Sequence, residues 1–253
     1  MTDLLIHDAI VVTVDHENRI LKNGSVRVTD GTISSVEPTE PADRRSTAEH
    51  VIDASGKVVI PGLIDAHRHT DFTLVQGLFS ELAGDELLKE AFALYHTAES
   101  TLGDDFFDAA WRLACLRQLT HGVTTVNAMD FTPELGAEAI GETGLRGVIG
   151  PELADFLNPT SADEQLADAR QFIETHHDTY DGRVTASIAP GGEVGCSREL
   201  WEGVAELRIE YPDLRLHTHL YDSAAADTMA AGSGADDPLD LLDRYGLLDE
   251  RTL

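Results

Sequence analysis

From residue 58 onward, short apolar runs alternate with longer segments of helical spacing. The segment "DDFFDAAWRLACLRQL", for example, repeats apolar residues three and four positions apart. Such alternation is typical of a parallel sheet whose strands are joined by crossover helices. We therefore predict an α/β fold with strands over residues 58–67, 123–129, 145–150, 184–189 and 214–221, the first of them buried.

The first part of the chain has a different pattern. "LLIHDAIVVTVD" is strand-like, and Asn23-Gly24 and Asp30-Gly31 are turn signals. We predict a small all-β unit over residues 1–57 and a second domain over residues 58–253. The second domain shows five strand–helix units and is shorter than the roughly 250 residues of an eight-unit barrel. Either its sheet is open, or the chain stops part-way round a barrel.

Local signals also predict where several helices begin. Pro133 is expected to open a helix that ends near Thr143. Ser161 and Glu164 form a capping-box pattern, and "DP" at residues 237–238 starts the last helix.

The charge of the chain excludes one class of partner. The sequence has 46 acidic and 18 basic residues, a formal net charge of −28. Because phosphate neutralisation needs a basic patch, we expect no nucleic-acid partner. A chain so acidic and so poor in lysine is typical of a halophilic protein that stays soluble in high salt, with an acidic mesophilic protein as the alternative.

The start of the chain and its cysteines bear on the compartment. "MTDLLIHDAIVV" has no basic region ahead of its apolar stretch, and no apolar run approaches the ~20 residues that span a bilayer. Cys115 and Cys196 lie far apart, which favours neither a disulfide framework nor a cysteine zinc site. We predict a cytoplasmic protein without a membrane partner.

Two pairs of histidines close apolar strands. "VVIPGLIDAHRHTDF" contains His67 and His69, and "LRLHTHLYD" contains His217 and His219. Residues two apart on a strand point to the same face, and sites in such folds lie at the carboxyl ends of the strands. Neutral imidazole binds zinc at ~2.0–2.1 Å and suits iron as well. We predict a metal site rather than two solvated loop pairs.

Several of these stretches resemble one known family. "GKVVIPGLIDAHRH" is similar to the first-strand signature of the metal-dependent amidohydrolase superfamily, and residues 3–38 resemble the small β-sandwich ahead of its barrel. "HGVTTVNAMD", "ETGLRGVIG" and "LRLHTHLYD" resemble strands two, three and five of the branch that holds cytosine, guanine and S-adenosylhomocysteine deaminases and the triazine hydrolases. The resemblance implies a partial TIM-type (β/α) barrel, about five of eight units, preceded by a β-sandwich domain.

The resemblance also implies a site with one divalent metal ion, zinc first and iron as the alternative. Asp222 falls where the branch usually has a glutamate that carries a proton from water to the departing amine. Aspartate is one methylene shorter, and capping a helix is its alternative role. The implied metal ligands are His67, His69 and His219.

Other residues of the family pattern are altered or lie outside this sequence. His217 is expected to be a hydrogen-bonded polar residue of the core. The fourth strand lacks the lysine that bridges two metals in other members, and Glu193 has little support as a substitute. The branch's strand-six histidine and strand-eight aspartate are not in the sequence, so we expect a C-terminally truncated chain that is poorly stable and inactive alone.

The resemblance implies a hydrolase of carbon–nitrogen bonds other than peptide bonds, acting by hydrolytic deamination of a nucleobase-like or nucleoside-like nitrogen heterocycle. A triazine chlorohydrolase or aminohydrolase, or a cyclic amidase, is the alternative on the same scaffold. A non-catalytic remnant is the alternative of another class. The expected partner is the small heterocycle, with a homo-oligomer left open, and residues 72–100 are expected to line the pocket.

Overall fold

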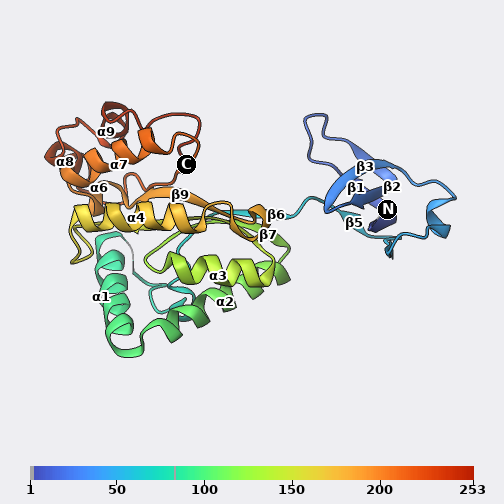
Figure 1. Ribbon diagram of the computed structural model, residues 1–253, viewed down its shortest axis with the longest axis horizontal. Helices are drawn as coiled ribbons and strands as arrows, with labels where there is room; N and C mark the ends of the chain where they lie inside the picture. Colours follow the sequence, from blue (N-terminus) through green and yellow to red (C-terminus); the bar gives the residue numbers. More distant parts are fainter. Residues whose placement is uncertain (1–2, 83) are drawn as a thin grey trace. The chain divides into compact units, whose positions relative to one another are not determined.

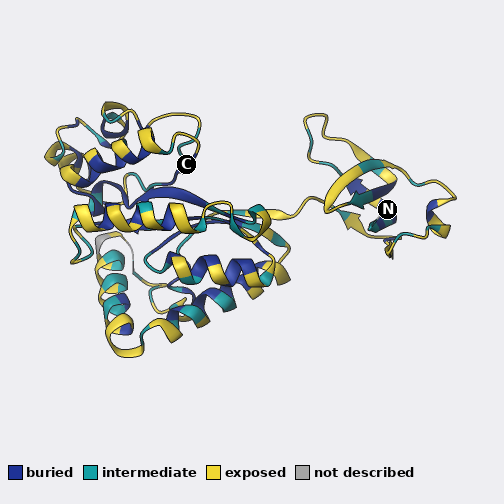
Figure 2. Ribbon diagram, in the orientation of Figure 1, coloured by how far each residue is buried: buried dark blue, intermediate teal, exposed yellow. Residues whose placement is uncertain are grey.

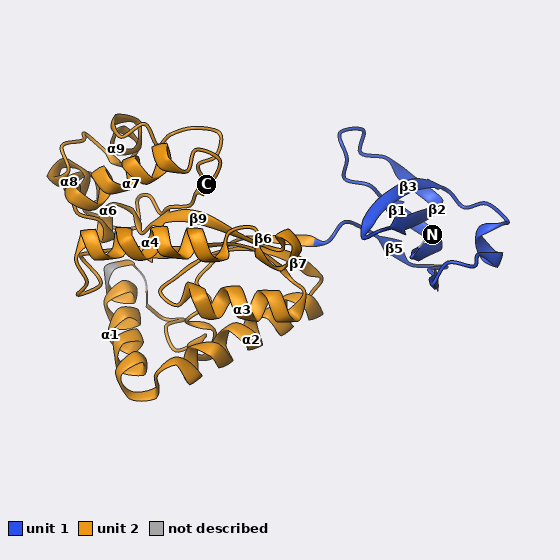
Figure 3. Cartoon of the chain, in the orientation of Figure 1, with its two compact units in different colours: residues 1–62 blue, residues 63–253 orange. Residues whose placement is uncertain are grey.

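The computed structural model describes residues 3–82 and 84–253. They form two compact units, residues 1–62 and residues 63–253 (Figure 3). The predicted domain boundary after residue 57 remains a prediction. No helix of the described part is both long enough and apolar enough to cross a membrane.

The first unit is a single five-stranded sheet. Its order is β3-β2-β1-β4, with β5 also paired to β1. Asp30 and Gly31 both have positive φ (50° and 71°) and make the tight turn between β2 and β3, as predicted. The strands are β1 (Leu4–Val12), β2 (Ile20–Thr29), β3 (Thr32–Pro38), β4 (His50–Asp53) and β5 (Val58–Val59).

The other turn expected in this unit is wrong. Asn23 and Gly24 lie inside β2, opposite a bulge in β1. A Cβ on Gly24 would lie 2.8 Å from Val11 Cγ2, so glycine here permits a close approach of two strands. The β-sandwich implied by the resemblance remains a prediction, because the described residues of this unit form one sheet.

The second unit is an α/β layer structure around a five-stranded parallel sheet. The strand order β10-β9-β8-β7-β6 follows the chain, and the pairing is parallel throughout. In the view of Figure 1, α2 and α3 lie below the strands of the sheet, and α7 and α9 lie above them. The strands are β6 (Leu63–Arg68), β7 (Val123–Asp130), β8 (Arg146–Leu153), β9 (Val184–Pro190) and β10 (Arg215–Leu216).

The helices begin where the sequence signals place them. Pro133 is the first residue of α3, Ser161 and Glu164 form a complete capping box, and the Asp237 side chain accepts the N–H groups of Leu239 and Asp240. The helices are α1 (Gly84–Leu102), α2 (Asp104–Thr120), α3 (Pro133–Thr143), α4 (Ala162–His176), α5 (Thr179–Gly182), α6 (Gly192–Gly195), α7 (Arg198–Glu210), α8 (Ala226–Gly232) and α9 (Pro238–Arg244).

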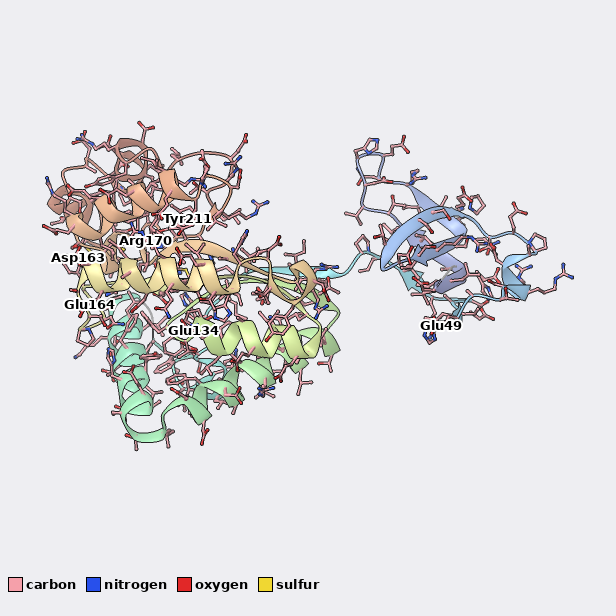
Figure 4. All side chains as sticks on the ribbon, viewed as in Figure 1. Glu49, Glu134, Asp163, Glu164, Arg170 and Tyr211 are labelled. Carbon is pink, nitrogen blue, oxygen red and sulfur yellow. The ribbon has the colours of Figure 1, made fainter. Side chains whose placement is uncertain are left out.

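The core of this unit lies between the central strands and the helices that cover them. Figure 2 shows the buried residues gathered on the sheet and on the inner faces of the helices. Gly203 on α7 packs so closely against Leu166 on α4 that a Cβ at this position would overlap Leu166 Cδ1. At the rim of the same helix pair, Arg170 Nε donates to Glu210 Oε2 at 2.9 Å, in the region labelled in Figure 4.

Two strand predictions need correction. Residues 58–67 are not one buried strand: Val58–Val59 pairs with β1, and Leu63–Arg68 is an outer strand of the parallel sheet whose Ile64 is 68% exposed. The two parts are separated by Pro61, which has no N–H for a ladder. The fifth strand is also shorter than predicted, since β10 covers only Arg215–Leu216.

Candidate metal centre

Three imidazole rings converge at the carboxyl end of the sheet. His67 lies in β6, His69 directly follows that strand, and His219 lies three residues beyond β10. The Nε2 atom of His219 is 3.0 Å from Nε2 of His69 and 3.3 Å from Nε2 of His67. Ligands held tetrahedrally at ~2.0–2.1 Å from one zinc ion lie roughly 3.3 Å apart. The three nitrogens therefore fit the donor set of a single divalent ion.

Two of these rings have a partner on their other nitrogen. His67 Nδ1 is 2.8 Å from Nε2 of His217, and His69 Nδ1 is 3.4 Å from Oε2 of Glu152. A partner at Nδ1 fixes the ring orientation and leaves the Nε2 lone pair free for a metal. His217 is 3% exposed and hydrogen-bonded, as expected for a polar residue of the core.

The surroundings favour neutral rings at three of the four positions. Burial lowers the pKa of His217 to about 3, and neighbouring histidines act in the same direction. Burial also lowers the pKa of His67 and of His219, with His69 adding to the effect in both. For His69, burial opposes the charged form, but the contact with Glu152 outweighs burial and raises the pKa. Neutral imidazole is the form that binds a metal ion.

Asp222 lies at the edge of this group. Its Oδ2 is 3.8 Å from Nδ1 of His219, and its side chain is 40% exposed. It does not cap a helix: α8 begins at Ala226, and its N-cap residue, Ala225, makes no side-chain cap bond. The helix-cap alternative for Asp222 is therefore wrong.

A cavity of about 460 Å³ opens over the histidines. Glu152, Asp222 and the three converging histidines form its polar part. Its apolar part is supplied mainly by residues 72–100, as expected, and includes Phe72, Phe79, Leu87, Leu88 and Phe92, together with Leu157. The arrangement can hold a small, largely apolar molecule beside the three nitrogens.

Comparison with known proteins decides the family. Residues 58–253 match the amidohydrolase family. This chain belongs to the amidohydrolase family. In this chain the histidines of "DAHRH" and "LHTHL" are the ones that meet in space.

The chain resembles curated and solved proteins over nearly its whole length. It is 31% identical, over 92% of the chain, to a 5'-deoxyadenosine deaminase of Methanothermobacter thermautotrophicus, and it covers 53% of that protein. Among solved structures, a triazine hydrolase of Arthrobacter aurescens aligns with 100% of the chain and 60% of its own length, at a TM-score of 0.86 and 22% identity. An adenosine deaminase of Xanthomonas campestris with bound zinc aligns over 99% of the chain and 56% of its own length, at a TM-score of 0.85 and 25% identity. The chain thus shares the fold of these neighbours over its own length and spans about half the length of the curated relatives it matches.

Sequence reasoning missed a pair of buried carboxylates near the three histidines. The N–H of Asp71 donates to Asp130 Oδ1 at 2.8 Å, and the N–H of Phe131 donates to Asp71 Oδ2 at 3.0 Å. Burial raises the pKa of Asp71 to about 6 and raises that of Asp130 as well. Asp71 is the first acid after the His67–His69 pair and Asp130 is the last residue of β7, and an acid at the end of a strand is a signal that could have been used. The crossed bonds hold the loop after His69 against the end of β7.

Glu152 was missed for a different reason. The third strand was predicted to end at residue 150, but β8 continues to Leu153 and carries Glu152 into the cavity.

Glu193 lies in α6 and is 2% exposed, and its Oε1 accepts the N–H of Asp222 at 3.2 Å. That contact explains its burial without a role as a metal bridge.

The first unit holds another group of ligand-type atoms, from His7, Asp8 and Asp53. Arg44 already pairs with Asp8 through two bonds of 2.6 and 2.8 Å. The side-chain hydrogen bond from Arg44 lowers the pKa of Asp8 to about 2. This group is therefore an ion-pair network of the small sheet.

Proposed function

We propose that this amidohydrolase deaminates a nitrogen heterocycle hydrolytically, with an adenine nucleoside as the first substrate to try. The observation that carries the proposal is the convergence of three imidazole Nε2 atoms at the base of an apolar cavity. The functions of the relatives support the choice of reaction, since one curated relative is a 5'-deoxyadenosine deaminase and a structural neighbour is an adenosine deaminase.

In this proposal, His67, His69 and His219 hold one divalent ion, zinc first and iron as the alternative. When bound, the ion would supply Lewis acidity and lower the pKa of water toward ~7. Asp222 lies beside the cavity and would carry a proton from that water to the leaving amine. The apolar side chains of residues 72–92 would exclude other water and orient the ring.

Glu152 and His217 would act through the ligands. Glu152 would keep a proton on His69 Nδ1, and His217 Nε2 would accept a hydrogen bond from the Nδ1–H of His67. Both contacts leave Nε2 unprotonated, which is the state a ligand needs. We further propose that the five-stranded sheet is part of a TIM-type barrel and that the acidic chain works in a high-salt cytoplasm.

Metal content and ammonia release test the proposal together. The chain would be loaded with zinc, its metal measured by mass spectrometry, and ammonia followed with 5'-deoxyadenosine and with a chlorinated triazine. One equivalent of zinc, lost in His69→Ala, with ammonia release from the nucleoside supports deamination. Release of chloride from the triazine instead supports the triazine hydrolase, and absence of both metal and turnover supports the non-catalytic remnant.

A further inference from the structure

The segment that carries His219 and Asp222 leaves the sheet early. β10 ends at Leu216, and the ladder continues for one more bond, from the N–H of His217 to the carbonyl of Ile188 at 2.9 Å. A ligand two residues beyond the last ladder bond needs another support, because a loose backbone would spread its side chain over many positions. The N–H of Thr218 donates to the carbonyl of Leu253 at 3.1 Å, and beyond that bond the support comes from the loop after β9.

Glu193 in that loop is a buried carboxyl with an unusual set of contacts. Its Oε1 accepts the N–H of Asp222 at 3.2 Å, while its Oε2 has no hydrogen-bond partner among the described residues. Tyr221, one residue earlier, has a φ of 63°, a left-handed conformation that a non-glycine residue adopts at a cost. A fixed acceptor next to a strained residue is a means of holding that backbone in place.

Gly192 brings the same loop against the metal-ligand segment. Its φ is +85°, and a Cβ at this position would lie 2.6 Å from the carbonyl oxygen of His219. Only glycine allows this approach, because any side chain would collide with the backbone of the ligand segment. The loop after β9 therefore touches the segment at His219 and again at Asp222.

We propose that Glu193 is a positioning residue: its Oε1, seated by the close approach of Gly192, fixes the backbone that presents His219 and Asp222 to the centre. The roles of those two residues rest on the proposed function, but the contact between Glu193 Oε1 and the N–H of Asp222 does not. What the site requires of Glu193 is an acceptor atom at Oε1, not a negative charge. Glutamine can supply that atom, whereas a side chain without an oxygen cannot.

Hydrogen exchange tests the contact between Glu193 and the Asp222 amide without metal or substrate. Glu193→Gln should leave exchange at the Asp222 amide near the wild-type rate, and Glu193→Met, which keeps the length of the side chain, should accelerate it about tenfold. Amides of α4 serve as the internal reference for global opening. Glu199→Gln, a change of an exposed glutamate on the neighbouring helix α7, is the matched control and should alter neither region.

Zinc affinity gives a second reading that follows the same order. Glu193→Met should weaken zinc binding about 10- to 100-fold, and Glu193→Gln should keep it, as expected for a group that orients a ligand. Equal exchange at Asp222 in wild type and Glu193→Met would overturn the proposal. So would a Glu193→Gln protein that behaves like Glu193→Met, because charge would then matter. If the exchange results are as expected and ammonia release is absent, the proposed reaction is wrong, and the positioning role of Glu193 is still supported.

Should Glu193→Met not fold, Gly192→Ala provides the test from the other side of the contact. It keeps the carboxyl and pushes the loop away from His219, so exchange at Asp222 should again accelerate. Unchanged exchange in a folded Gly192→Ala protein would overturn the proposal.

Discussion

His217 Nε2 lies 2.8 Å from Nδ1 of His67, although the two residues are 150 positions apart in the chain. The other nitrogen of His217 is buried and has no partner in the described structure. His217 Nε2 can accept a hydrogen bond from the Nδ1–H of His67 only if the proton of His217 sits on its own unpartnered Nδ1. The arrangement therefore sacrifices one hydrogen bond to keep the Nε2 lone pair of His67 directed at the centre.

Removing this support should weaken metal binding without removing a ligand. We expect His217→Ala to lower zinc affinity about 10- to 100-fold, and His67→Ala to lower it further, because the first loses orientation and the second loses a donor. Competition with a chromophoric chelator measures both constants. His16→Ala, a change of an exposed histidine in the turn between β1 and β2, is the control. Equal losses in His217→Ala and His67→Ala would argue that His217 itself is a ligand.

Asp222 can be separated from the metal ligands by its effect on turnover. Asp222→Asn should reduce kcat for ammonia release by about 10²- to 10⁴-fold, because the amide cannot accept the proton. Zinc content should stay at the wild-type level. Asp222→Glu restores the longer side chain usual in the branch and should keep most of the activity. A large loss of zinc in Asp222→Asn would show that the carboxylate acts through the metal site instead.

The contact between α4 and α7 predicts a sharp difference between two glycine-to-alanine changes. Gly203→Ala places a methyl group against Leu166 and should lower the free energy of unfolding by about 1–3 kcal/mol. Gly232→Ala, at a helical position where a Cβ meets nothing within 4 Å, should raise it by about 0.5–1 kcal/mol. Urea unfolding of both variants measures the two changes, and a shared sign would contradict the packing described.

The net charge of −28 predicts a dependence of stability on salt. Raising potassium chloride from about 0.1 M to 1 M shortens the screening length from about 10 Å to 3 Å, which weakens repulsion among the acidic side chains. The free energy of unfolding should rise over that range. Potassium chloride is the appropriate salt, since sulfate also strengthens the hydrophobic effect. A midpoint that falls or stays constant would remove the basis for the high-salt interpretation.

The sequence predicted the larger elements because their signals are local. Pro133, Ser161 and Asp237 each determine a helix start through the bonds of a single turn, so neighbouring residues were enough. Val58–Val59 failed because its apolar character suits either sheet, and only the three-dimensional pairing shows that it joins β1. Asn23-Gly24 failed because the same glycine that favours a turn also permits a close strand approach.

For the site, the sequence indicated the histidine pairs but not which nitrogen of each ring faces the others. That choice depends on Glu152 and His217, partners that lie far away in the chain and contact the rings only after folding. Glu193 gave even less warning, since its role consists of one bond to the backbone N–H of Asp222. Sequence patterns identify side chains that carry chemistry more readily than the groups that hold them.

β6 and β10 are the two outer strands of the parallel sheet, yet His69 and His219, which follow them, come within 3.0 Å of each other. An ion bound by both residues would join the two outer strands of the curved sheet. Moving the two strands apart would remove a ligand from the ion, so metal binding would stabilise the folded state. The free energy of unfolding would rise by about 2.7 kcal/mol when the free metal concentration is 100 times Kd. The midpoint of unfolding would therefore report whether the metal site is occupied, without the use of a substrate.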